Sequence, residues 1–160
     1  MNRCIEMNLE ILGKIRELLS SIDPSNYQQP HAQFFDSSIG GHVRHILDFY
    51  ERFFEGSDTK TVDYSNRKRD INLEQLPLAA LSVLDTILIR IRELVDGPVT
   101  VISDSGESFA SSLGRELEFL AGHAVHHNAM IVAMSRSQDI IIAPEIAFAK
   151  STLDYRKASA

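Results

Sequence analysis

Two histidines four residues apart are the sequence feature with the clearest chemistry. His123 and His127 occur in the stretch FLAGHAVHHNAMI. In a helix, side chains at positions i and i+4 share one face, with Cβ atoms about 5–6 Å apart, so two imidazoles can hold one metal ion. A zinc protease motif would place glutamate directly after the first histidine, where this chain has Ala124. The spacing therefore indicates a metal site or a buried, hydrogen-bonded histidine, and it disfavours a metalloprotease.

A second cluster, HVRHILD, supplies His42, His45 and Asp48. Histidines on two helices that both carry an apolar stripe can converge across a helical bundle. Three neutral imidazoles would leave a fourth position open, as in catalytic zinc sites, although imidazole also suits nickel, iron and copper. Helical phase places His42 about 60° and His45 about 120° from the centre of the apolar stripe, so phase alone favours His42 as the inward residue.

Four long helical patterns must position these side chains. The leucines and isoleucines recur every three or four residues, and a serine or asparagine that could cap the helix stands at the second, third and fourth expected helix starts. A segment rich in β-branched residues predicts a short hairpin or extended loop at 99–109. The expected helices span residues 2–22, 37 or 38 to 56, 72–95, and 111 or 112 to 134. The sequence thus predicts an all-α protein: one four-helix-bundle domain over 1–160, with a long loop between the second and third helices and an irregular C-terminal tail.

Composition narrows the class of protein. Hydrophobic residues make up 44% of the chain and the formal net charge is −6, which is ordinary for a globular domain and disfavours binding to nucleic acid or an anionic membrane. No run of about 18 apolar residues occurs, so we expect no membrane span. One cysteine, Cys4, and an amphipathic N-terminal pattern unlike a signal peptide lead us to expect a cytoplasmic protein.

Two helical stretches and a pair of further segments also resemble a known family, the DinB/YfiT-like superfamily of small metal-binding four-helix bundles. SSIGGHVRHILDFYE is similar to its second helix, with Ser38, His45 and Asp48 at the pattern positions. LGRELEFLAGHAVHHNAMI is similar to its last helix, with both histidines of the HxxxH pair. VDYSNRKRD and IAPEIAFAKSTLDYR look like the loop and tail of one subgroup.

The resemblance implies a ligand set and a range of activities. The implied metal ligands are His45, His123 and His127, with His42 and Asp48 as alternatives or as residues that orient a ligand. The implied cofactor is a divalent ion, zinc or nickel first and iron or manganese next. The family also implies a homodimer and a small-molecule substrate, in some members with a thiol cofactor.

Two classes of function follow. In the first, the chain is a metal-dependent hydrolase or thiol transferase, and Arg67 and Arg69 could clamp a substrate carboxylate. Glu116 could act as a base, but an ordinary interaction with the N-terminal end of its helix is favoured. In the second, the chain is a non-catalytic binding or structural protein stabilised by metal, with a fourth protein ligand that closes the site.

Overall fold

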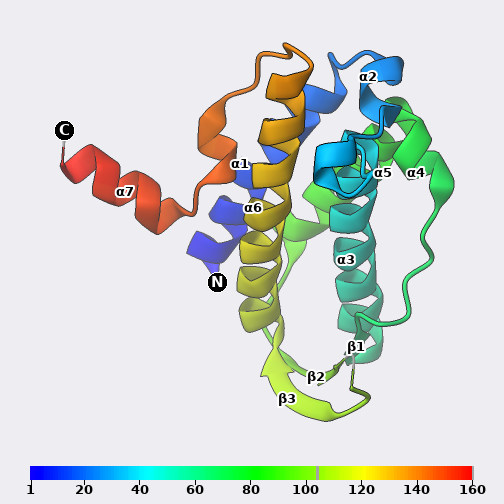
Figure 1. The fold of residues 1–160 in the computed structure, drawn as a ribbon. Helices are drawn as coiled ribbons and strands as arrows, with labels where there is room; N and C mark the ends of the chain where they lie inside the picture. Colours follow the sequence, from blue (N-terminus) through cyan, green and yellow to red (C-terminus); the bar gives the residue numbers. More distant parts are fainter. Residues whose placement is uncertain (104, 160) are drawn as a thin grey trace.

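Four long helices form the body of the protein (Figure 1). The computed structural model describes residues 1–103 and 105–159. Helix α1 packs against α5 and α6, and α3 packs against the same two helices, so the four surround one core. Their bounds are Asn2–Leu19 (α1), Ile39–Thr59 (α3), Pro77–Glu93 (α5) and Leu113–Ser137 (α6).

Apolar side chains at helical spacing explain why these helices pack together. Each long helix buries one face, and burial of a leucine or isoleucine side chain contributes about 1.5–3 kcal/mol to folding. The fully buried side chains include Leu12 and Ile15 of α1, Val43, Ile46 and Tyr50 of α3, Leu84 and Ile91 of α5, and Leu117, Leu120 and Ile131 of α6.

Two serines cap the helices that carry the histidines. The hydroxyl of Ser38 accepts a hydrogen bond from the Gly41 N–H at 3.0 Å, and that of Ser112 accepts one from the Arg115 N–H at 3.2 Å. Each such cap contributes about 1 kcal/mol. The predicted starts of α3 and α6 are therefore confirmed.

A three-stranded mixed sheet corrects the all-α prediction. Strand β1 (Thr61–Asp63) pairs in parallel with β2 (Pro98–Ile102), which pairs antiparallel with β3 (Ser108–Ser112). The β2–β3 pair forms where a hairpin was expected. Strand β1 lies in the segment that was expected to be a loop. Its partner strand is more than thirty residues away along the chain, so no local periodicity predicts the pairing.

The junction between α3 and β1 differs from the prediction for a steric reason. Gly56 was expected to end the helix, but α3 continues to Thr59 and Lys60 ends it in the left-handed region, at φ 65°. Gly56 is buried against β1, and a Cβ built there would overlap with the side chain and backbone of Val62. Glycine at this position therefore permits the close approach of strand and helix.

Shorter elements correct the rest of the predicted outline. The segment expected to form the third helix contains two helices, α4 (Ile71–Gln75) and α5. Helix α5 begins at Pro77, because a proline is well tolerated at the first helical position. The tail contains a 3₁₀ turn, η2 (Pro144–Ala147), and α7 (Lys150–Ala158), so the expectation of an irregular tail is wrong. Helix α2 (Pro24–Gln28) and the 3₁₀ turn η1 (Ala32–Phe34) connect α1 to α3.

The C-terminal apolar segment packs on the bundle. Ile146 is 2% exposed and belongs to the core, whereas Ile141 is almost fully exposed. Helix α7 then extends away from the four long helices (Figure 1). Among the described residues, no helix is both long enough and apolar enough to cross a membrane.

Candidate metal centre

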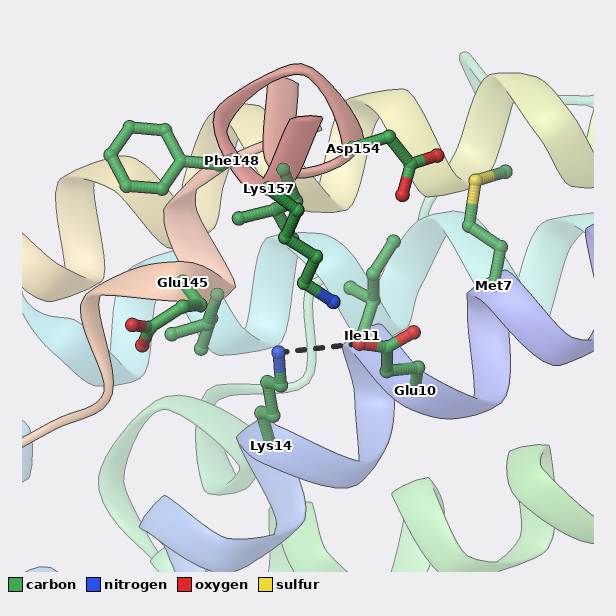
Figure 2. A pocket seen from close by; sticks show the side chains of 10 residues that line it. Met7, Glu10, Ile11, Lys14, Glu145, Phe148, Asp154 and Lys157 are labelled. Atoms are coloured by element: carbon green, nitrogen blue, oxygen red, sulfur yellow. Dashed lines mark ion pairs between the residues drawn. The ribbon is translucent and has the colours of Figure 1, made fainter. Parts of the chain in front are cut away.

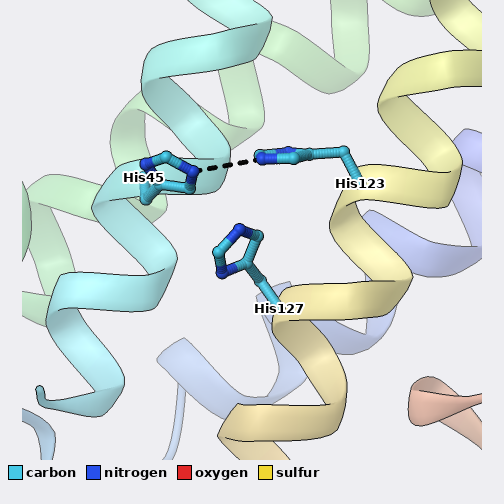
Figure 3. A group of neighbouring side chains, drawn as sticks. All are labelled: His45, His123 and His127. Atoms are coloured by element: carbon cyan, nitrogen blue, oxygen red, sulfur yellow. Dashed lines mark hydrogen bonds between the residues drawn. The ribbon is translucent and has the colours of Figure 1, made fainter. Parts of the chain in front are cut away.

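Helices α3 and α6 run side by side and bring four histidines together. His42 and His45 lie on α3, and His123 and His127 lie one turn apart on α6. Figure 3 shows the rings of His45, His123 and His127 pointing into the space between the two helices. All three side chains are half-buried, between the core and solvent.

The three rings lie close enough to hold one ion. The Nε2 atoms of His45 and His123 are 3.1 Å apart, and one nitrogen from each of the three rings lies within 4.8 Å of the others. Two ligands of a tetrahedral zinc ion, with bonds of about 2.0–2.1 Å, stand about 3.3–3.4 Å apart. The group therefore needs only small side-chain movements to bind a metal. The expected convergence is confirmed; coordination by these residues remains a proposal.

Burial keeps these imidazoles neutral, which is the form that binds metal. Desolvation, together with the neighbouring His123 and Arg67, lowers the pKa of His45 to about 4. Desolvation likewise lowers the pKa of His123 to about 4 and that of His127 to about 3. Near neutral pH all three rings therefore present a lone pair rather than a charge.

His42 contacts His127 on the side away from the other two histidines. Its Nδ1 lies 2.9 Å from Nδ1 of His127, which leaves the other nitrogen of His127 to face His45 and His123. The three-histidine group includes His45 and not His42, although helical phase favoured His42. The apolar stripe of α3 points toward the centre of the bundle, whereas a site shared with α6 must lie at the side of that stripe.

Asp48, the expected alternative or orienting residue, is paired with an arginine. Its carboxylate is buried and accepts a hydrogen bond from Arg44 at 2.8 Å, and Arg44 also pairs with Glu74 at 2.9 Å. Burial raises the pKa of Asp48, and the charge of Arg44 opposes that rise. Asp48 is not part of the described histidine group. It instead links α3 to α4 through Arg44.

Arg67 reaches the histidines from the loop between β1 and α4. Its Nη1 lies 3.2 Å from Nδ1 of His45, and its guanidinium carbon lies 5.0 Å from the centre of the Phe49 ring. Arg69, the other expected clamp residue, has an exposed side chain and a left-handed backbone at φ 53°. The structure thus brings one of the two arginines to the site.

Aromatic rings that the sequence analysis did not identify lie along one side of the histidine group. Phe49 stacks on His123 with ring centres 4.1 Å apart, and Tyr64 stacks on Phe49 with ring centres 5.2 Å apart. The sequence signal for Phe49 was its position four residues after His45 on the same helix. These rings shield one side of the histidine group from water.

Two hydrogen bonds occupy the carboxylate of Glu116, which disfavours a role as a base. Its carboxylate accepts from the Ser111 hydroxyl at 2.6 Å and from the Tyr64 hydroxyl at 3.1 Å. It lies in the first turn of α6, where a negative charge interacts favourably with the helix N-terminus. The ordinary structural role expected for Glu116 accounts for both of its oxygens.

Two surface hollows differ in their relation to the histidines. One, of about 510 Å³, opens beside His123 and is lined by Arg115, Glu118, Phe119 and Gly122. A smaller one, of about 90 Å³, lies between α1 and the C-terminal segment and contains the Lys14–Glu10 ion pair (Figure 2). No histidine lines the smaller hollow. Of these two hollows, the one at His123 gives a ligand access to the candidate metal centre.

Comparisons with family models, with curated proteins and with solved structures find no match to the chain. The fold and the site themselves define the class of protein: it is mainly helical, with a small mixed sheet and a three-histidine group that could hold a metal ion.

Proposed function

We propose that His45, His123 and His127 bind one divalent metal ion, and that the protein is a DinB-like metal-dependent enzyme of the hydrolase or thiol transferase class. The observation that carries the proposal is the convergence of three neutral imidazoles from two helices. Imidazole ligands suit zinc and nickel among other ions, and the family resemblance puts zinc or nickel first, with iron or manganese as further candidates. The substrate is a small molecule, with a thiol as cofactor in the transferase case.

An open coordination position is supported by the residues around the group. Within the described parts of the chain, no further histidine, cysteine or acidic side chain joins the three histidines. Asp48, the acidic candidate for a fourth ligand, is held by Arg44. A bound divalent ion lowers the pKa of a water or thiol at such a position, which supplies a nucleophile near neutral pH.

The protein's own residues supply binding and orientation. His42 fixes the ring of His127 through the nitrogen that faces away from the group. The stacked rings of Phe49 and Tyr64 exclude water from one side and lower the local dielectric, which strengthens charge interactions at the site. Together they hold the histidines in one arrangement before a ligand arrives.

A non-catalytic, metal-stabilised protein is the alternative, and one observation favours it. The Nε2 atom of His42 is buried and has no hydrogen-bond partner. A movement of the His42 ring beside His127 would add a fourth imidazole and close the site. A closed four-histidine site would stabilise the fold without offering a position for substrate.

Metal analysis followed by cobalt substitution tests the proposal. Protein purified without a nickel column should contain close to one divalent ion per chain, and the His127→Ala variant should contain much less. Cobalt in the site should absorb visible light, and an added thiol should change that spectrum if a position is open. An unchanged spectrum would favour the closed, non-catalytic site, and a metal content equal in both proteins would refute the ligand assignment.

A further inference from the structure

In the contact between Arg67 and His45, the histidine ring accepts a hydrogen bond, whereas the second ring nitrogen of a metal-bound histidine donates one. Guanidinium nitrogens only donate hydrogen bonds, so Nδ1 of His45 must accept from Nη1 of Arg67 across 3.2 Å. A neutral His45 then carries its proton on Nε2. If Nε2 binds metal, a neutral ring carries the proton on Nδ1, which can no longer accept from arginine. Metal binding through Nε2 of His45 would therefore release Arg67.

The released guanidinium has unused capacity to bind a ligand. Its Nε is already buried without a hydrogen-bond partner. The face of Phe49 supports it from one side at 5.0 Å, which keeps the group next to the histidines. A planar, half-buried guanidinium in such a place matches the two oxygens of a carboxylate.

The local charges favour an anion once a metal is bound. Arg44 and Arg67 carry two positive charges, and Asp48 and Glu74 carry two negative charges that pair with Arg44. These four groups cancel. A divalent ion held by three neutral imidazoles then adds two positive charges that no described side chain of the group offsets. A ligand with a negative charge would restore the balance in a partly desolvated site.

We propose that the site recognises a small molecule that places a carboxylate on Arg67 while a second donor group occupies the open metal position. This inference rests on the proposed metal site and names the class of its substrate. Arg67 is then a substrate-binding residue, and Arg69, whose side chain is exposed, is not.

A matched pair of ligands and a matched pair of variants test the inference. 3-Mercaptopropionate and 3-mercaptopropionamide have the same length and the same thiol for the open metal position, but the carboxylate of the first is a neutral amide in the second. Both are titrated into the cobalt-loaded protein, and binding is read from the visible absorption. Arg67→Gln and Arg69→Gln each remove one positive charge from the same loop, so a general effect of charge would appear in both.

The wild-type protein should bind 3-mercaptopropionate about 10- to 100-fold more tightly than 3-mercaptopropionamide, as expected for a charge-assisted hydrogen-bonded pair. The Arg67→Gln variant should retain cobalt and lose most of this preference, while Arg69→Gln should keep it. An equal preference in wild type and Arg67→Gln, or an equal loss in both variants, would overturn the inference while leaving the metal site standing. Failure of the wild type to bind cobalt would overturn the proposed function and this inference together.

Discussion

The metal-dependent stability of the His127→Ala variant tests the site most directly. If three imidazoles bind an ion only in the folded protein, the ion stabilises the fold by RT ln(1 + [L]/Kd), about 2.7 kcal/mol at a hundredfold excess over Kd. For a chain of 160 residues, each kcal/mol raises the melting temperature by about 2–4 °C. Zinc should therefore raise the melting temperature of the wild type by about 5–11 °C.

His127→Ala should lose most of this rise. The Nε2 atoms of the two remaining histidines, His45 and His123, would still lie 3.1 Å apart, but they offer two ligands where the site offers three. The variant should stay folded without metal, because the buried faces of four helices supply the core. Thermal melts of each protein with and without zinc isolate the metal effect from any change in basal stability.

His126→Ala is the matched control for this experiment. His126 is the adjacent residue, its side chain is exposed, and it is not part of the three-histidine group. Its removal should leave the zinc-induced rise unchanged. The reasoning fails if zinc raises the melting temperature of wild type and His127→Ala equally, or if His126→Ala loses as much as His127→Ala.

Three further predictions concern the pH dependence of stability, a buried glycine and the oligomeric state. Unfolded histidines have a pKa of about 6.5, whereas the pKa of the folded His45 and His123 is about 4, so the unfolded state binds more protons between these two pH values. The free energy of unfolding of the metal-free protein should therefore fall as pH drops from about 6.5 to about 4. Urea unfolding should show a weaker pH dependence for the His45→Asn variant. Gly56→Ala should destabilise the fold by about 1–3 kcal/mol because its Cβ would force β1 away from α3, whereas Gly97→Ala, with open space around the new Cβ, should cost little in the same unfolding assay. We also expect a homodimer, as the family resemblance implies; light scattering should give twice the mass of 17.9 kDa, and the monomer mass would remove this expectation.

Local sequence patterns determined the helices and half of the candidate site. Helical spacing of apolar residues and the capping serines located α1, α3 and α6, because both signals act within a few residues along the chain. The same local geometry placed His123 and His127 on one face of α6.

Only the tertiary structure decided which other residues meet that pair. The choice between His45 and His42 depends on the side of α3 that faces α6, and the arrival of Arg67 depends on the path of a loop after β1. Strand β1 likewise forms because Val62 is buried and its backbone pairs with a segment almost forty residues further along the chain. Periodicity shows which face of an element is apolar, but the relative rotation of two packed elements is set by the fit of all their side chains at once.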